Sequence, residues 1–328
     1  MRGRVFSGAR PTGRQHLGNY FGAIRNYVAL QDDYDCVYCV VDLHALTSLL
    51  DTSLLRQYTY EMVLDWLAAG MDPARSIVFV QSHVPQVTEL ATLFGMVTPL
   101  GWLTRLPTFK DKVREQPDNV NYGLVGYPVL MAADITLYKA DTVPVGVDQA
   151  PHLEFTREIV RRFNARYGEV LVEPQMKLTE IPKVPGLDGI GKMSKSLEKD
   201  NSIDLADSPE EIRRKVMGGV TDPARQYKKD PGHPEICNIF ALHKLICSDT
   251  AKMDQIERDC RSAQIGCVEH KRMFAEELIE YLAPFRAIRE KYAERPDDVW
   301  DILRDGAARA RLLAAQTMDE VKRAVQLP

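Results

Sequence analysis

The chain has 328 residues, a length that suggests about two domains with a sizeable core and excludes a small disulfide-stabilised scaffold. With 45% hydrophobic and 27% charged residues, the composition is that of a globular protein and excludes wholesale disorder. The 42 basic and 46 acidic residues give a net charge of −4, so a nucleic-acid partner would need a local basic patch.

Uncharged stretches in the sequence are short. The longest, residues 90–104 and 119–133, fall below the roughly 18 residues that a membrane-spanning helix needs. Met-Arg-Gly-Arg at the N-terminus runs directly into Val5 and Phe6 without an apolar signal segment. We therefore expect a soluble, cytoplasmic protein with no membrane partner, whose six cysteines are thiols or metal ligands rather than disulfides.

The first half of the sequence alternates short β-branched or aromatic runs with longer segments that have helical apolar spacing. Strands are predicted at Arg4–Ser7, Cys36–Val41, Ser76–Gln81 and Thr142–Val145. Helices that can connect parallel strands are predicted at Tyr20–Gln31, Ser53–Ala69 and Gln86–Val97. This order predicts an α/β fold with a Rossmann-like, doubly wound parallel sheet.

The second half is predicted to be mostly helical. Residues 182–191 are rich in proline and glycine and predict a mobile loop. A helix start follows at Ser208-Pro209-Glu210-Glu211, and helical character continues beyond it except over residues 221–234. We expect a Rossmann-like domain at residues 1–200 and an all-helical domain at residues 201–328.

A glycine-containing turn follows the first predicted strand and leads into a helix near Leu17. A helix N-terminus offers free N–H groups and a positive dipole end to an anion. His16 and Asn19 lie one turn apart and can both donate to phosphate, while Gly18 leaves room for a flat ring. An ordinary helix cap explains these residues about as well.

A second motif, Gly191-Lys192-Met193-Ser194-Lys195-Ser196, ends the predicted loop. Ammonium groups on such a loop can close over a substrate and neutralise charge that develops on leaving pyrophosphate. Taken alone, the motif could also be a simple surface loop. Together with His16-Leu17-Gly18-Asn19, it resembles the two signatures of class I aminoacyl-tRNA synthetases.

The closer resemblance is to tryptophanyl-tRNA synthetases and extends over essentially the whole chain. It is carried by residues 127–135 (Tyr-Pro-Val-Leu-Met-Ala-Ala-Asp-Ile), residues 143–149 (Val-Pro-Val-Gly-Val-Asp-Gln) and residues 152–158 (His-Leu-Glu-Phe-Thr-Arg-Glu). The resemblance implies that residues 1–200 are a catalytic domain and residues 201–328 a tRNA- and anticodon-binding domain. It also implies a homodimer, with tRNA(Trp) and L-tryptophan as substrates and no DNA partner.

For the amino acid, the resemblance implies that Asp134 accepts the indole N–H. An indole N–H only donates, and a site built around such a bond can reject analogues lacking it by about 10⁴–10⁵. Gln149 is expected to hold the polar end of tryptophan. The rest of the implied pocket, which would otherwise be assigned to the core, consists of Phe6, His44, Tyr127, Met131, Val143 and Val145.

For the nucleotide, the resemblance implies ATP-binding roles for Arg10, His16, Gly18, Asn19, Asp148, Lys192, Met193, Ser194 and Lys195. Of these, Asp148 is expected to hold the ribose hydroxyls. The implied catalytic set, which holds the phosphates, is His16, Asn19, Lys112, Lys192 and Lys195. Mg²⁺ should accompany ATP, although the sequence shows no carboxylate cage for it. Val147 and Arg10 stand where the family commonly has glutamate and glutamine.

The implied activity is ATP-dependent ligation of tryptophan to tRNA. A tyrosyl-tRNA synthetase is one alternative, because it shares the fold and both loop types, but its loop usually reads Lys-Phe-Gly-Lys-Ser and it lacks Met-Ala-Ala-Asp. A catalytically idle RNA-binding paralogue is another.

Because the net charge is negative, RNA would have to bind local basic clusters. Their members are Arg157, Arg161, Arg162, Arg166, Arg213, Arg214, Lys215, Arg225, Lys228 and Lys229. A solvated helix face is the ordinary interpretation of such residues.

The cysteines fall into two groups. Cys36 and Cys39 lie three apart in a predicted strand and therefore point to opposite faces, which favours core thiols. Cys247 is expected to be a packed helix residue.

The other three cysteines belong to a spaced motif. Cys237, Cys260, Cys267 and His270 follow C-x22-C-x6-C-x2-H, which is similar to a tryptophanyl-tRNA synthetase subset whose fourth ligand to a [4Fe–4S] cluster is a cysteine. Imidazole can ligate iron, and Cys₃His is also a structural zinc set. An iron–sulfur cluster, zinc and a relict without metal all remain open.

Overall fold

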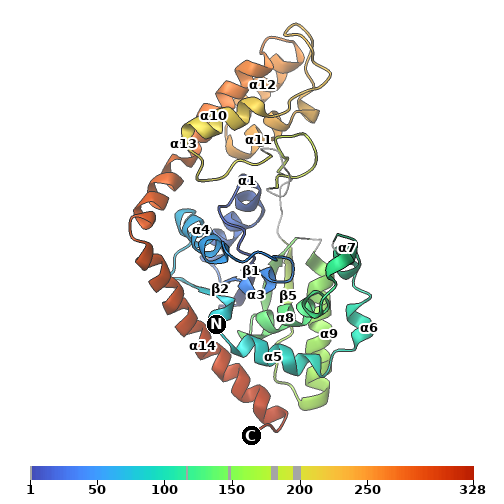
Figure 1. Ribbon diagram of the computed structural model, residues 1–328. Coiled ribbons are helices and arrows are strands. Elements are labelled where there is room, and N and C mark those ends of the chain that lie inside the picture. Colours follow the sequence, from blue (N-terminus) through green and yellow to red (C-terminus); the bar gives the residue numbers. More distant parts are fainter. Residues whose placement is uncertain (1, 116, 147–148, 179–183, 195–200) are drawn as a thin grey trace.

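The computed structural model describes residues 2–115, 117–146, 149–178, 184–194 and 201–328. Figure 1 shows a part built around a sheet, a helical part above it, and two long helices along one side of both. These long helices are α13 (Cys267–Ala293) and α14 (Pro296–Ala324). Among the described residues, no helix has the length and apolar character needed to cross a membrane.

In the described part of the chain, five parallel strands form the sheet, in the order β3-β2-β1-β4-β5. Their bounds are β1 Arg4–Ala9, β2 Asp35–Val40, β3 Ser76–Val80, β4 Thr142–Val145 and β5 Gln175–Leu178. In the register, Val5 of β1 lies between Cys36 of β2 and Thr142 of β4. The predicted α/β fold with a Rossmann-like parallel sheet is confirmed, and β5 is an additional edge strand.

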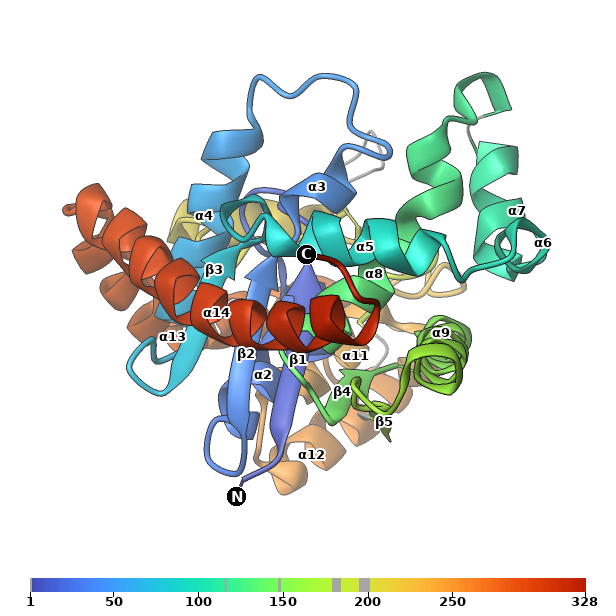
Figure 2. The same ribbon diagram turned by 90° about the horizontal axis from the view of Figure 1, so that it is seen from below.

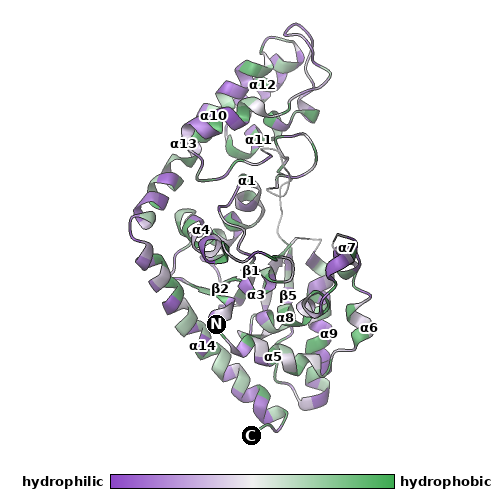
Figure 3. Ribbon diagram, viewed as in Figure 1, coloured by the Kyte–Doolittle hydropathy of each residue, from purple (hydrophilic) through white to green (hydrophobic). Residues whose placement is uncertain are grey.

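Helices connect the successive strands, as the sequence predicts. In the sheet part they are α1 Leu17–Asn19, a π-helical turn Tyr20–Ile24, α2 Arg25–Leu30, α3 Asp42–Ala45, α4 Leu55–Ala68, α5 Gln86–Gly95, α6 Leu100–Leu103, α7 Pro107–Glu115, α8 Tyr122–Leu137 and α9 Ala150–Tyr167. The helical part adds α10 Pro209–Gly218, α11 Asn238–Ile246 and α12 Thr250–Arg261. Hydrophilic and hydrophobic residues alternate along α13 and α14 (Figure 3), as expected for helices with one buried face.

Both faces of the sheet are covered, as a doubly wound fold requires. On β2, Val37 and Cys39 lie in a core shared with α5, α8 and α9, whereas Cys36 and Tyr38 lie in a core shared with α2 and α4. Cys36 and Cys39 are therefore buried on opposite faces of one strand, and the expectation of core thiols is confirmed.

Helix α14 passes along the edge strand β3 from one face of the sheet to the other (Figure 2). Its first part contributes Val299 and Leu303 to the core under α4, and its later part contributes Ala310 and Ala314 to the core under α8. The backbones meet at Gly306, where an added Cβ would lie 1.9 Å from the carbonyl oxygen of Val78. The helix thereby covers the edge that β3 would otherwise expose.

We expect Gly306→Ala to lower the free energy of unfolding by about 2 kcal/mol, because the new methyl group overlaps the Val78 carbonyl and the helix must move outward. Urea unfolding monitored by circular dichroism measures this change. Gly95→Ala is the matched control, since an added Cβ at the end of α5 meets nothing within 4 Å and should leave stability unchanged or slightly higher. Equal stability of the two variants would contradict the close approach of α14 to β3.

Candidate active site

A cavity of about 490 Å³ opens at the carboxyl edge of the sheet, between β1 and β4. The strand order reverses at this point, because the chain runs from β1 outward to β3 and then returns to place β4 on the other side of β1. Parallel α/β sheets bind ligands where the strand order reverses in this way. Phe6 and Ser7 of β1 and Val143 and Val145 of the neighbouring strand β4 line it from the sheet.

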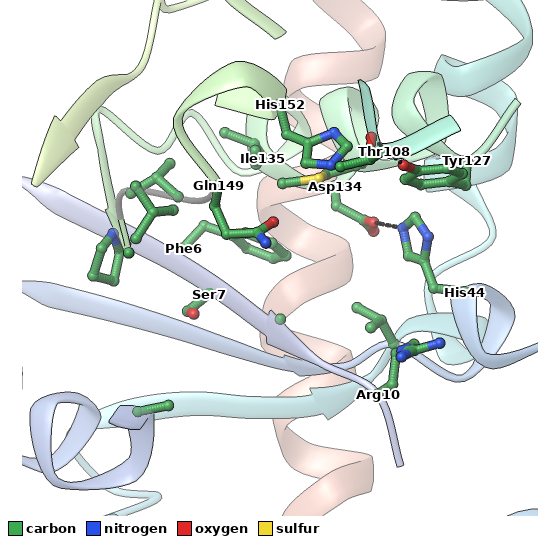
Figure 4. Close-up of a pocket in the computed structure, with 18 of the residues that line it drawn as sticks. Phe6, Ser7, Arg10, His44, Thr108, Tyr127, Asp134, Ile135, Gln149 and His152 are labelled. Atoms are coloured by element: carbon green, nitrogen blue, oxygen red, sulfur yellow. Dashed lines mark hydrogen bonds and ion pairs between the residues drawn. The ribbon is translucent and has the colours of Figure 1, made fainter. Parts of the chain in front are cut away.

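All of the residues expected to form the amino-acid pocket line this single cavity. They are Phe6, His44, Tyr127, Met131, Asp134, Val143, Val145 and Gln149. Figure 4 shows His44 and Asp134 pointing toward one another, with Tyr127, Thr108 and His152 beside them and Gln149 next to Phe6. The sequence positions of these residues are far apart, so the fold itself assembles the pocket.

Asp134 is a carboxylate held in place within the cavity wall. It lies on α8 and is only 2% exposed. Nε2 of Gln81 donates to both of its carboxylate oxygens at 2.8 Å, and Nε2 of His44 lies 2.8 Å from Oδ2. His44 on α3, which follows β2, and Gln81, which follows β3, therefore fix the orientation of one buried acceptor.

Gln81 was not among the residues predicted from the sequence. It is fully buried, follows β3 directly, and its Oε1 accepts the backbone N–H of Leu43 at 3.1 Å. The available signal was its position, because a polar residue directly after a buried parallel strand faces the ligand-binding edge of the sheet.

Tyr127 contacts two further residues of the cavity wall, Thr108 and His152, to which the sequence assigns no role. Its hydroxyl donates to Oγ1 of Thr108 at 2.9 Å, and its ring stands edge-on to that of His152 with centroids 5.7 Å apart. Burial raises the pKa of the Tyr127 hydroxyl, although the bond to Thr108 opposes this, so the hydroxyl is neutral. No sequence signal distinguishes Thr108 from other threonines.

Two basic side chains, Lys112 and Arg10, border the same cavity. Nζ of Lys112 lies 5.4 Å from the centre of the Tyr127 ring, and Lys112 lines the cavity. Lys110, two residues away on α7 and therefore on the other side of that helix, is exposed and outside the cavity wall. Arg10 also lines the cavity, where its Nη1 donates to Oγ of Ser48 at 3.1 Å.

His16 and Asn19 cap α1 reciprocally. The backbone N–H of His16 donates to Oδ1 of Asn19 at 3.0 Å, and the backbone N–H of Asn19 donates to Nδ1 of His16 at 3.3 Å. This is the helix cap that the sequence left open as one interpretation. The helical turn that follows brings Gly22 and Ala23 into the cavity wall.

The fold brings the second motif against the first. An added Cβ on Gly18 would lie 2.8 Å from the His16 ring and 3.4 Å from Cβ of Met193. Met193 is buried in a core with Leu17, while its neighbour Lys192 is exposed and bridges to Pro185. Ser194 is half-buried beside them, and Lys195, Val147 and Asp148 lie outside the described residues.

The family resemblance assigns this turn to ATP, and on that expectation Gly18→Ala should raise the KM for ATP about tenfold and leave the KM for tryptophan unchanged. The methyl group must displace the His16 ring from its capping position, because Met193 closes the other side. ATP–pyrophosphate exchange at varied substrate concentrations measures both constants. A change in the tryptophan constant alone would contradict a nucleotide role for this turn.

Known proteins share both the sequence pattern and the fold of this chain. Residues 2–283 match the family described as tRNA synthetases class I (W and Y). A tryptophan–tRNA ligase of Deinococcus radiodurans is 46% identical over 98% of both chains, and one of Thermotoga maritima is 43% identical over 99% of both. The chain belongs to the tryptophanyl-tRNA synthetase family. The structure described as tryptophanyl-tRNA synthetase from Campylobacter jejuni with ADP and tryptophan superposes with a TM-score of 0.90, at 34% identity over 99% of this chain and 100% of the other.

The spaced cysteines of this family member lie near one another. Nη1 of Arg225 is 3.9 Å from Sγ of both Cys260 and Cys267. Burial raises the pKa of the Cys237 thiol, and the neighbouring Cys267 and Cys260 raise it further. Gly232 packs directly on Cys260, where an added Cβ would lie 2.4 Å from Sγ.

His270 is placed with other partners. Its Nε2 lies 3.0 Å from Nδ1 of His243, and the two rings stack with centroids 5.2 Å apart. Burial, followed by the charge on His243, lowers the pKa of His270 to about 4. Three thiols of the predicted set therefore gather, whereas the Nε2 atom of the fourth member contacts His243.

Four residues of the basic clusters are paired with acids. Arg157 and Arg161 both contact Glu173, at 2.7 and 2.6 Å, and Arg213 contacts Glu276 at 2.7 Å. Lys215 is bonded to the buried Asp207. These pairs reduce the positive charge that either cluster presents to a polyanion.

Proposed function

We propose that the protein is an ATP-dependent tryptophan–tRNA ligase, which activates L-tryptophan as its adenylate and transfers it to tRNA(Trp). The observation that carries this proposal is the buried Asp134 acceptor at the end of an apolar cavity. Its relatives from Deinococcus radiodurans and Thermotoga maritima are both described as tryptophan–tRNA ligases.

Tryptophan recognition follows from the chemistry of the indole. Its N–H needs an acceptor, and its large apolar surface needs apolar walls such as Phe6, Met131 and Val143. Because Gln81 and His44 already satisfy part of the Asp134 carboxylate, little reorganisation is required when the indole arrives. Gln149, which lines the cavity next to Phe6, is proposed to bind the polar end of the amino acid.

In the first step, a carboxylate oxygen of tryptophan attacks the α-phosphorus of ATP, and the bond to the β-phosphate breaks to release pyrophosphate. The carboxylate is already ionised, so no general base is needed and catalysis consists of positioning and charge neutralisation. Lys112 in the cavity wall and Lys192 on the loop supply positive charge for the departing phosphates, together with Lys195. Mg²⁺ is proposed to accompany these phosphates.

Nucleotide binding is assigned to the two adjoining motifs. The contact between Gly18 and Met193 supports a single site, with His16, Asn19 and Arg10 from one side and Lys192 and Ser194 from the other. Asp148 is proposed to bind the ribose hydroxyls. In the second step, a hydroxyl of the 3′-terminal ribose of tRNA attacks the acyl carbon of the adenylate, and AMP leaves.

The three gathered cysteines are proposed to hold a [4Fe–4S] cluster. Each thiolate would ligate a different iron atom, so the sulfurs stand farther apart than the roughly 3.5–4 Å expected around one zinc ion. The spacing of Cys237, Cys260 and Cys267 and their proximity to one another support this proposal. His270 is not proposed as the fourth ligand through Nε2, because that atom contacts His243.

Purification without oxygen tests the cluster. Broad visible absorption and bound iron in the wild type, both lost in Cys260→Ser, are expected. Colourless protein without iron would refute it.

Several further properties remain proposals. Residues 1–200 are proposed as the catalytic part and 201–328 as the tRNA-binding part, although α14 packs on the sheet. A cytoplasmic location is proposed from the sequence.

A homodimer is also proposed. It would bury apolar side chains that are exposed in the single chain, such as Leu50, Met96 and Leu100, and sedimentation velocity tests the oligomeric state.

Amino-acid-dependent ATP–pyrophosphate exchange tests the activity. Exchange with tryptophan but not with tyrosine is expected. Exchange with tyrosine alone would instead identify a tyrosyl enzyme, and binding of tRNA without any exchange or charging would identify an idle RNA-binding paralogue.

A further inference from the structure

A separate group of metal-binding side chains lies in the helical part, where α11 meets α13. His243 on α11, Cys247 directly after α11 and Glu277 on α13 each offer one ligand atom, and these atoms lie within 4.8 Å of one another. His243 is fully buried, and the other two are partly exposed. None of the three belongs to the spaced cysteine motif.

The distances match the size of a first-row metal ion. Zinc binds nitrogen and oxygen at about 2.0–2.2 Å and sulfur at about 2.3 Å, so neighbouring ligands of a tetrahedral site lie roughly 3.5 Å apart. Nε2 of His243 and Oε2 of Glu277 are now 3.0 Å apart and joined by a hydrogen bond. These two atoms would therefore need to move apart by less than a bond length for an ion to enter between them.

We propose that His243, Cys247 and Glu277 bind one divalent transition-metal ion, of which zinc is the best match, with water as the fourth ligand. An imidazole, a thiolate and a carboxylate are a mixed set that suits zinc and disfavours magnesium or calcium. The partial exposure of Cys247 and Glu277 provides the path for the ion and the place for the water.

The surrounding contacts orient two of the ligands. Nζ of Lys252 holds Oε1 of Glu277 at 2.6 Å, which leaves Oε2 toward His243 as a monodentate ligand. His270 contacts the second nitrogen of His243, which is the position that an outer partner of a metal-bound histidine normally takes.

Binding of a divalent ion also conserves charge and protons at this site. The ion takes the place of the proton on Nε2 of His243, and this proton moves to Nδ1 of the same ring. The proton on Nε2 of His270 then moves to the other nitrogen of that ring, so that Nε2 accepts from Nδ1 of His243. The Cys247 thiol releases its proton to water. One proton therefore leaves for each ion bound, and the site becomes neutral with one thiolate and one carboxylate.

Cobalt titration of the full-length Cys260→Ser variant tests the proposal, because this variant disables the spaced cysteine motif and retains the proposed site. One equivalent of Co²⁺ should give tetrahedral visible bands and a charge-transfer band with the intensity of a single thiolate. Adding Cys247→Ser should abolish the charge-transfer band and weaken Co²⁺ binding at least tenfold. Zinc should displace the cobalt and raise the melting temperature only while Cys247 is present.

Two outcomes would overturn the site: no stoichiometric cobalt spectrum in the Cys260→Ser variant, or a spectrum that Cys247→Ser leaves unchanged. Glu277→Gln provides a second variant that retains the size of the side chain and weakens binding without removing the thiolate band. A band that disappears in Cys267→Ser but persists in Cys247→Ser would assign the metal to the spaced cysteines instead.

Discussion

Replacing Asp134 by asparagine should raise the KM for tryptophan about 100-fold while the KM for ATP changes less than about threefold. The asparagine has one acceptor oxygen instead of two, and its NH₂ group faces the donors of Gln81 and His44. The indole N–H then loses a charged acceptor, a loss of about 2–3 kcal/mol in a buried site. ATP–pyrophosphate exchange at varied concentrations of each substrate measures both constants.

Asp42→Asn provides the matched control for this change. Asp42 also follows a strand at the carboxyl edge of the sheet, but its carboxylate accepts from the backbone N–H of Ser82 and lies outside the cavity wall. This variant should retain both constants. Equal losses for tryptophan and ATP in Asp134→Asn would mean that Asp134 supports the fold rather than the indole.

Lys192→Ala should lower kcat for pyrophosphate exchange by about 10²–10³ and leave the KM for tryptophan nearly unchanged. Lys192 is exposed and precedes Met193, the residue that contacts Gly18 of the α1 turn. Its positive charge should stabilise the transition state most, because negative charge develops on the pyrophosphate as it departs. Single-turnover formation of the adenylate provides the direct measurement.

The control for the loop is Lys110→Ala, which removes an exposed lysine of α7 outside the cavity wall and should leave kcat unchanged. A rise in the tryptophan KM with constant kcat in Lys192→Ala would contradict a role in the departure of pyrophosphate.

Four of the five strands were predictable, because buried strands of a parallel sheet are continuous apolar runs that end in polar residues or turns. Strand β5 was not, since it is an edge strand with Gln175, Lys177 and Leu178 exposed and no apolar run to mark it. The predicted helix at Tyr20–Gln31 begins as a π-helical turn, which apolar spacing alone does not distinguish from an α-helix.

The pocket was predictable only through the family resemblance. In the sequence, apolar residues such as Phe6 and Val143 look the same whether they line a cavity or fill a core. Only the fold distinguishes the two cases. Gln81 was missed because its partner Asp134 lies on another element, so their pairing has no local pattern. The contact of His270 with His243 depends on how α11 packs on α13, which spacing along one helix does not reveal.

The position of α14 on strand β3 has a consequence for how the chain folds. The edge of the sheet is completed by a helix that is synthesised only after the whole helical part, so native closure of the core cannot precede synthesis of α14. Until then, an unpaired strand edge with apolar neighbours is open to pairing with other chains. Nascent or truncated chains that lack α14 should therefore aggregate and depend on chaperones, even though they contain every residue of the cavity.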